Sequence, residues 1–329
     1  MRKVIYIEKD IKDLPRTKYI LKKFKNPIII LIDRYSEVFN KKNQNFRLQK
    51  INPAIILAKK YKNFILETPK SYTIGKKNNY YFSYMYNCLF DCRYCFLQGM
   101  YNSSNFVIFI NYEDFFKEIS FLKKKNIGKN TTIFSGYDCD SLAYDNITNF
   151  SNSVLKYFEN FNDIELEIRT KSTYLKPFYR RSLKNIVLAF SFTPERFSTK
   201  YELGVASLKK RVDALKKVVN FGWNIGIRFD PFVIYEGWEA DYERLFKILF
   251  STVPREQIHS VTYGNIRYPK KIFNNIKKMY TNEKLFLKFE KNKKNIYDEN
   301  NGELIDNFCK NYLFTQIDQS KVFCNIHEK

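Results

Sequence analysis

Short apolar runs separated by longer amphipathic stretches characterise the chain from residue 80 onward. Brief apolar runs are typical of strands, and apolar positions that repeat every three or four residues are typical of helices. The pattern predicts strands at 80–84, 132–134, 164–168, 186–191, 225–229 and 258–263 and helices at 111–123, 145–161, 205–221, 242–250 and 270–280. Repeated strand–helix units predict a parallel sheet with right-handed crossovers. About six units favour an α/β fold, an incomplete (β/α)6 barrel with its chemistry at the C-terminal strand ends.

The first part of the chain has a different spacing of apolar runs, which predicts a small N-terminal α/β domain. The expected elements are a strand at 4–7, an amphipathic helix within 12–24, a buried strand at 28–32 and two runs, 55–57 and 64–66, close enough to form a hairpin. Polar clusters with Pro and Gly around 68–70 and 75–79 predict a boundary. We therefore expect a domain at 1–75, the barrel at 76–281 and a basic C-terminal extension at 282–329.

The composition is that of a folded protein. Of the 329 residues, 44% are hydrophobic and 28% are charged, which excludes disordered and collagen-like chains. No apolar run approaches the ~18 residues that a membrane span needs, and residues 1–4 do not begin a signal peptide. We therefore expect a cytoplasmic protein with no membrane partner, in which the six cysteines are reduced thiols or metal ligands.

The net charge suggests a polyanionic partner. Lys and Arg total 57 against 34 Asp and Glu, which gives +23. Such a charge attracts polyanions. A chain rich in Lys, Asn, Ile, Tyr and Phe is also what an AT-rich genome encodes, so codon bias accounts for part of the excess. The charge favours nucleic-acid binding without establishing it.

Three cysteines, Cys88, Cys92 and Cys95, are spaced C-x3-C-x2-C after a predicted strand. A structural zinc site needs four protein ligands, and the chain's two histidines are remote in sequence. An ordinary [4Fe–4S] cluster is also held by four cysteines, so three leave one iron open to chelation by an amino acid's amino and carboxylate groups. A zinc site and three unrelated buried cysteines are the alternative interpretations.

The C-x3-C-x-aromatic-C motif, with Tyr94 as the aromatic residue, resembles the signature of radical S-adenosylmethionine (SAM) enzymes. Further stretches resemble the spore photoproduct lyase family, in the same order, between about residues 4 and 280: 33–35, 38–40, 45–50, 95–98 and 235–238. The resemblance implies a partial barrel with a [4Fe–4S] cluster and reductive cleavage of SAM to a 5′-deoxyadenosyl radical. In the lyases that radical abstracts hydrogen from a thymine dimer in DNA. It also implies UV-damaged DNA as a partner and an external electron donor such as flavodoxin or ferredoxin.

The resemblance assigns roles to individual residues. Cys88, Cys92 and Cys95 match the cluster ligands, and Tyr94 matches the aromatic residue close to the cofactor. The positions that match cofactor-binding residues are Lys171 for the SAM carboxylate, Ser191 for a further contact, and Ser135 with Gly136 for backbone groups that meet the methionine amine. A flexible ammonium at a strand end suits a carboxylate. The alternative for Lys171 is a solvated surface lysine, and for Gly136 an ordinary turn.

Two positions depart from the family pattern. The lyases place a hydrogen-donating cysteine just after the second strand, where this chain has Tyr137, and Cys139 follows two positions later. Positions i and i+2 of extended backbone face the same side, so we expect Cys139 to reach the cavity and to be catalytic together with Tyr94. The alternative is a small buried apolar residue. The tyrosine that assists the cysteine in the lyases is Phe96 here, which has no O–H.

Charged residues near the fifth predicted barrel strand have two interpretations. Arg228 and Asp230 flank Phe229 and so share a face, and Arg211 lies on the preceding helix. An ion pair that closes the barrel and contact with the cofactor both fit this pattern.

Three functions follow. The first is a radical SAM lyase that reverses a pyrimidine photolesion in DNA. The second keeps the radical chemistry and assigns RNA, a protein or a small metabolite as substrate, because Tyr137 and Phe96 depart from the pattern and no arginine follows Arg267, although the lyases use a C-terminal arginine to pry out the lesion. The third is a non-catalytic iron–sulfur or zinc protein that binds nucleic acid.

Overall fold

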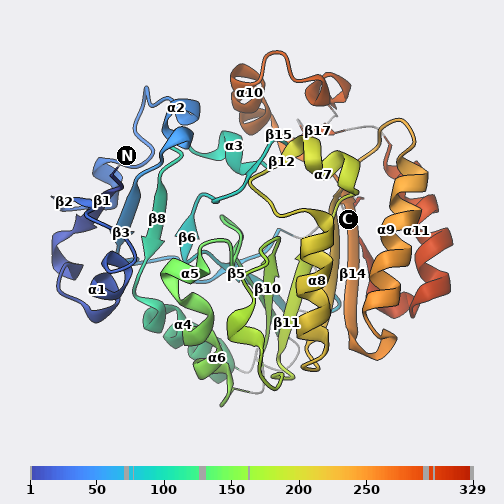
Figure 1. Cartoon of the computed structure of the whole chain (residues 1–329), viewed down its shortest axis with the longest axis horizontal. Helices are drawn as coiled ribbons and strands as arrows, with labels where there is room; N and C mark the ends of the chain where they lie inside the picture. Colours follow the sequence, from blue (N-terminus) through green and yellow to red (C-terminus); the bar gives the residue numbers. More distant parts are fainter. Residues whose placement is uncertain are drawn as a thin grey trace.

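The computed structural model describes residues 2–69, 74–76, 78–125, 131–161, 164–291, 296–298 and 301–326. These residues form a five-stranded sheet in the order β2-β1-β3-β8-β6 and an eight-stranded sheet in the order β18-β14-β13-β11-β10-β9-β5-β4 (Figure 1). Two smaller sheets pair β12 with β7 and join β15, β17 and β16. Their strands are β7 (Asp91–Cys92), β12 (Glu202–Leu203), β15 (Arg267–Pro269), β16 (Glu290–Lys291) and β17 (Ile296–Asp298).

The five-stranded sheet contains the predicted N-terminal strands. Its members are β1 (Val4–Glu8), β2 (Ile28–Ile32), β3 (Ile55–Ala58), β6 (Met85–Tyr86) and β8 (Phe106–Phe109), and only β6 runs antiparallel to its neighbour. The helices of this region are α1 (Pro15–Leu21) and α2 (Phe46–Ile51), with 3-10 turns η1 (Lys9–Ile11) and η2 (Tyr35–Glu37). Strands β6 and β8 follow residue 75, so this sheet contains residues from both sides of the predicted domain boundary. The domain boundaries themselves stay predictions.

Two expectations for this region are wrong. The run 28–32 forms a strand, but it is not buried: Ile28 to Leu31 are 39–48% exposed. The continuous apolar run resembled a buried strand, whereas β2 lies at the edge of the sheet and pairs only with β1. The runs 55–57 and 64–66 do not form a hairpin. Strand β3 pairs in parallel with β1 and β8, and β4 (Leu66–Glu67) pairs with β5 of the other sheet.

The eight-stranded sheet confirms the predicted parallel architecture. The six predicted strands pair in parallel, each with the next: β5 (Asn78–Phe82), β9 (Thr131–Ser135), β10 (Ile164–Thr170), β11 (Ile186–Ser191), β13 (Asn224–Phe232) and β14 (Ile258–Asn265). Helices between these strands lie along one side of the sheet (Figure 1): α4 (Tyr112–Lys124), α5 (Asp145–Thr148), α6 (Phe150–Phe158), α8 (Leu208–Val219) and α9 (Trp238–Thr252). The predicted helix 145–161 is divided into α5 and α6 because Asn149 adopts a left-handed conformation, with φ of 52°.

Part of the predicted C-terminal extension continues the sheet. After η5 (Lys284–Lys288), helix α11 (Gly302–Gln316) lies beside α9, and after η6 (Gln319–Lys321) strand β18 (Val322–Cys324) pairs in parallel with β14 (Figure 1). These residues therefore add a strand–helix layer that the Lys- and Asn-rich pattern did not reveal.

A charged pair occupies the interior of the half-barrel. The Arg228 guanidinium lies 2.7 Å from the Glu167 carboxylate, and both side chains are at most 2% exposed. Gly226 leaves room for it, since a Cβ there would lie 2.5 Å from Arg228 Nη2. Arg228 therefore forms a barrel-closing ion pair, with Glu167 on β10 as its partner, and Asp230 instead accepts from Thr262.

Short helices gather where the parallel strands end. Helices α2, α3 (Leu97–Met100), α7 (Glu195–Tyr201) and α10 (Lys270–Met279) lie at the top of Figure 1, with 3-10 turns η3 (Lys176–Phe178) and η4 (Arg255–Gln257) elsewhere. This end of the molecule holds the cysteine motif. None of the helices in the described ranges is long and apolar enough to cross a membrane.

Candidate active site

A cavity of about 560 Å³ opens at the C-terminal ends of the parallel strands. It is lined by all nine residues that the sequence assigned to a site: Cys88, Cys92, Tyr94, Cys95, Ser135, Gly136, Cys139, Lys171 and Ser191. Ser135 closes β9, Lys171 follows β10 and Ser191 closes β11. The topology therefore brings together residues that are up to about a hundred positions apart in sequence.

The cysteine motif forms one wall of the cavity. Cys92 ends β7, whose partner β12 places Glu202 opposite it, and the Cys95 N–H donates to the Cys92 carbonyl at 3.0 Å. Burial raises the pKa of all three thiols, that of Cys88 to about 12. Without a metal the thiols therefore keep their protons, and a bound metal would have to displace them.

The cysteine wall fits a cluster better than a single ion. Across the described stretches, no three His, Cys, Asp or Glu side chains converge closely enough to hold one metal ion. Cys88, Cys92 and Cys95 nevertheless face the same cavity, which has room beyond them. Thiolates are the preferred ligands of iron–sulfur clusters, and three of them would leave one iron of a four-iron cluster without a protein ligand.

The Lys171 side chain lies in a buried polar network and is not a solvated surface lysine. It is 12% exposed, and its ammonium lies 3.4 Å from the Glu202 carboxylate and 5.7 Å from the centre of the Tyr94 ring. Glu202 also accepts from the Tyr94 hydroxyl and lies 3.1 Å from the Arg211 guanidinium. Burial would raise the pKa of Glu202, but the charges of Lys171 and Arg211 lower it to about 2, so the carboxylate stays ionised.

Asp140 fastens the turn after β9 to the end of β10. Its carboxylate accepts from the Lys171 N–H at 2.5 Å and from the Thr170 hydroxyl at 2.7 Å. Gly136 begins this turn with φ of +75°, a conformation that side chains disfavour. A Cβ at Gly136 would clash with Ser141 Oγ and lie 2.9 Å from the Cys139 carbonyl oxygen. This position thus requires glycine for close packing as well as for the turn.

The hydroxyl of Ser135 is engaged within the protein. It lies 2.9 Å from Ser141 Oγ and donates to the Glu167 carbonyl at 3.1 Å. Ser191 is 7% exposed, and its carbonyl accepts from the Arg211 guanidinium at 3.1 Å. Both serines are therefore held at the strand ends by hydrogen bonds to neighbouring elements.

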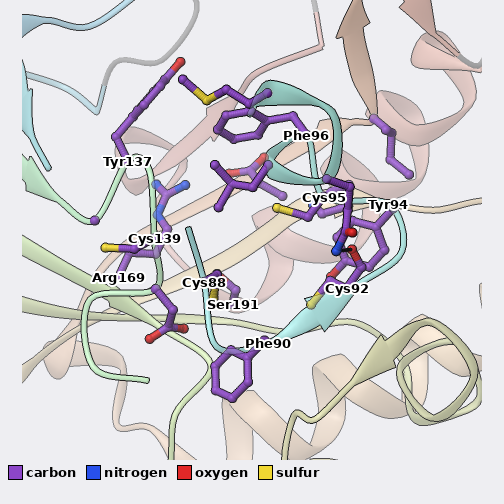
Figure 2. Close-up of a pocket in the computed structure, with 18 of the residues that line it drawn as sticks. Cys88, Phe90, Cys92, Tyr94, Cys95, Phe96, Tyr137, Cys139, Arg169 and Ser191 are labelled. Carbon is purple, nitrogen blue, oxygen red and sulfur yellow. Dashed lines mark hydrogen bonds between the residues drawn. The ribbon is translucent and has the colours of Figure 1, made fainter. Parts of the chain in front are cut away.

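Cys139 reaches the cavity for a different reason from the expected one. The chain is not extended there but turns after Gly136, so that both Tyr137 and Cys139 line the cavity. Figure 2 shows Tyr137, Cys139 and Arg169 across the cavity from Cys92, Tyr94 and Cys95. Burial raises the pKa of the Cys139 thiol well above its usual value, so the thiol keeps its hydrogen.

Tyr137 lies beside Phe96, which stands where the lyases have a tyrosine. Its ring centre is 5.8 Å from that of Phe96 and 4.2 Å from that of Tyr81, on which it stacks. A phenol and a thiol, Tyr137 and Cys139, thus occupy one turn opposite the cysteine wall. The cavity holds both kinds of hydrogen-carrying group although Phe96 carries none.

Several residues of the site were not identified from sequence. Asp140 stands in an Asx-type turn, where its carboxylate accepts from the Leu142 and Ala143 N–H groups at 2.9 and 2.8 Å, a local signal that could have identified it. Glu202 has no local signal, because it meets Tyr94 only through the pairing of β12 with β7. Lys50, on α2, also lines the cavity.

Comparisons with known proteins, by sequence and by fold, give consistent matches. A protein-family model described as Spore photoproduct lyase (SPL) matches residues 1–322. Spore photoproduct lyase of Bacillus subtilis (strain 168) is 24% identical over 248 residues, 71% of this chain and 72% of the relative. That of Clostridium acetobutylicum is 23% identical over 331 residues, 95% of each chain.

The fold is shared with solved structures. A mutant spore photoproduct lyase with bound AdoMet and dinucleoside spore photoproduct superposes with a TM-score of 0.83 at 17% identity and covers 100% of this chain and 99% of that chain. A spore photoproduct lyase complexed with dinucleoside spore photoproduct gives a TM-score of 0.79, also at 17% identity, over 99% and 98% of the two chains. The predicted incomplete barrel is confirmed.

Proposed function

This chain belongs to the spore photoproduct lyase family, and from that premise we propose that it is a radical SAM carbon–carbon lyase that reverses a pyrimidine photolesion in DNA. One observation carries the proposal: all nine residues matched to family roles line one cavity at the strand ends of the half-barrel. A second cavity, between η4 and the end of α11, contains none of them.

Cys88, Cys92 and Cys95 would hold the [4Fe–4S] cluster. When bound, the cluster supplies the electron that cleaves SAM to a 5′-deoxyadenosyl radical. The chain's own residues hold the reactants in place: the thiols fix the cluster to the loop between β6 and α3, and the cavity encloses the space beside it.

Lys171 would bind the SAM carboxylate. Lys171 and Arg211 together carry two positive charges against the single carboxylate of Glu202. One positive charge of this trio is therefore not compensated within it, which suits an anionic group of the cofactor. Tyr94, held by its hydrogen bond to Glu202, and the strand ends at Ser135–Gly136 and Ser191 would complete the SAM site.

Cys139 would return a hydrogen atom to the substrate radical: its S–H bond would break, a C–H bond would form and the unpaired electron would pass to the sulfur. Its buried, neutral thiol has the hydrogen to give, and Cys139 lines the cavity in the turn that follows Gly136. DNA would reach the site through long-range attraction to the +23 chain. A damaged base is extruded from the duplex at lower cost than a sound one. The electron would come from an external donor such as flavodoxin or ferredoxin.

The test is product analysis under anaerobic conditions. Purified protein is reconstituted with iron and sulfide, then given dithionite, SAM and either dinucleoside spore photoproduct or UV-irradiated DNA, with undamaged DNA in parallel. We expect 5′-deoxyadenosine together with restored thymine from the damaged substrates only. Release of 5′-deoxyadenosine with no restored thymine would contradict lesion repair while leaving the radical chemistry in place.

A second candidate keeps the radical chemistry and assigns another substrate, RNA, a protein or a small metabolite. Tyr137 and Phe96 favour it, because they replace the cysteine and tyrosine of the lyases. Undamaged RNA, peptide and metabolite mixtures in the same assay distinguish the two candidates, since only the second predicts substrate-dependent release of 5′-deoxyadenosine without a photolesion.

A further inference from the structure

The ammonium of Lys50 reaches from helix α2 to the loop that carries the cysteines. Its Nζ donates to the Cys88 carbonyl at 2.6 Å and to the Phe90 carbonyl at 3.3 Å. Lys50 also lines the cavity beside the thiols. A residue from the N-terminal part of the chain thus brings a positive charge to the backbone of the first cysteine of the motif.

Helix α2 is held so that Lys50 keeps this position. Asn45 caps the helix by accepting from the Leu48 N–H at 3.0 Å. Arg47 forms two hydrogen bonds with the Asp91 carboxylate, at 2.9 and 3.1 Å, and Gln49 accepts from the Ser104 N–H at 3.0 Å. This short helix is therefore tied to Asp91 within the cysteine motif and to Ser104 after it, and these contacts hold the Lys50 ammonium in place.

The Lys50 ammonium differs from that of Lys171 in its partners. Within the described residues, Lys50 takes part in no ion pair, and its hydrogen-bond partners are carbonyl oxygens. The other lysine at the thiols, Lys171, lies 3.4 Å from Glu202. Of these two ammonium groups beside the thiols, Lys50 is therefore the one that is not paired with a described carboxylate.

We propose that Lys50 is a positioning residue that holds the cysteine loop and raises the reduction potential of the cluster bound there. This inference rests on the proposed function. Reduction adds one electron to the cluster and therefore one negative charge, while Lys50 forms no bond and transfers no proton. A fixed positive charge in a partly buried site stabilises the more negative, reduced state, and nearby charge is one of the factors that set iron–sulfur potentials.

The test compares reduction potentials of reconstituted variants. Lys50→Met removes the charge and the hydrogen bonds, Lys50→Gln keeps a donor without the charge, and Lys50→Arg keeps the charge. Lys41→Met is the matched control, because Lys41 is an exposed lysine in the loop before α2. The cluster of each protein is titrated with dithionite against redox mediators, and its reduced form is followed by electron paramagnetic resonance.

At a fixed potential near the wild-type midpoint, we expect the reduced-to-oxidised ratio to fall about tenfold in Lys50→Met and Lys50→Gln, which is 59 mV for one electron. Lys50→Arg and Lys41→Met should titrate like wild type. An unchanged midpoint in Lys50→Gln would overturn the proposal even if Lys50→Met binds no iron. An equal shift in Lys41→Met would also overturn it, because the effect would then be a general one of net charge.

These readouts separate the two proposals. The midpoint needs only the cluster, so a Lys50-dependent potential in a protein that restores no thymine supports the role of Lys50 and contradicts lesion repair. Restored thymine with the same midpoint in wild type and Lys50→Gln supports lesion repair and overturns the role of Lys50.

Discussion

The Lys171 ammonium lies 3.4 Å from the carboxylate of Glu202, and neither side chain is more than 12% exposed. The two residues come from different strand–helix units, and Glu202 also lies opposite Cys92 in the pairing of β12 with β7. The contact therefore ties the proposed SAM-binding lysine to the cysteine loop. It also places the carboxylate between two cations, since Arg211 lies 3.1 Å away.

Replacing Glu202 with glutamine is expected to destabilise the metal-free protein by about 3–5 kcal/mol, because it leaves two buried cations without their anion. Chemical denaturation in urea measures the loss. The control is Glu195→Gln, at an exposed position in the first turn of α7, which should unfold like wild type. Equal stability of the two variants would contradict the structural role given to Glu202.

Gly136 and Gly204 provide a matched pair for the turn that carries Cys139. Both have positive φ, +75° and +79°, but a Cβ at Gly204 would meet no atom within 4 Å, whereas one at Gly136 would lie 2.9 Å from the Cys139 carbonyl oxygen. We expect Gly204→Ala to cost about 1–2 kcal/mol of unfolding free energy from backbone strain alone.

Gly136→Ala should cost a further 1–3 kcal/mol or so from overpacking, and it should lower SAM cleavage because the turn must shift. Denaturation of both alanine variants, with 5′-deoxyadenosine release measured in parallel, checks the difference. If both variants lose the same stability and both keep full SAM cleavage, close packing at Gly136 has no role in the site.

The barrel was predictable because it depends on local pattern, since strands β9 to β14 and their helices follow from apolar periodicity. Lys171 and Ser191 were assigned by the family resemblance, and their places at strand ends, which parallel topology brings together, agree with that assignment. The spacing of Cys88, Cys92 and Cys95 identified the residues that form one wall of the cavity. These features need no knowledge of which distant segments meet.

The features that were missed depend on distant pairing. Whether 28–32 is buried depends on strand order, because β2 is apolar on both faces yet lies at a sheet edge. Glu202 and Tyr94 are 108 positions apart and meet through a two-residue strand pair. Lys50 is one lysine among many in sequence, and only the position of α2 brings it to Cys88.

Glu167 makes stability depend on pH in the acid range. Burial would raise its pKa, but Arg228 and Arg169 lower it to about 2, against an ordinary value of 4.5. A group whose pKa is depressed by folding stabilises the folded state above its unfolded pKa and loses that contribution as pH falls through the folded pKa. We expect of order 3 kcal/mol to be lost between about pH 4.5 and pH 2.

Urea denaturation between pH 7 and pH 2 measures this dependence, and Glu167→Gln identifies its source. The glutamine variant should be less stable than wild type at pH 7, since Arg228 loses its buried partner, and its stability should vary less between pH 4.5 and 2. Parallel curves for the two proteins would show that another carboxylate is responsible.

Cys139→Ala separates the cleavage of SAM from the return of hydrogen to the substrate. The variant keeps the three cysteine ligands and the Lys171–Glu202 pair, so it should cleave SAM. Restored thymine should fall at least about tenfold, which is about 1.4 kcal/mol in the barrier, because the substrate radical loses its proposed hydrogen donor. Cys309→Ala is the control, because Cys309 is also buried but lies on α11 and outside the cavity lining. Thymine yield in Cys139→Ala equal to that of the control would exclude the thiol as the donor. A loss confined to Tyr137→Phe would then assign the hydrogen to the phenol that stacks on Tyr81.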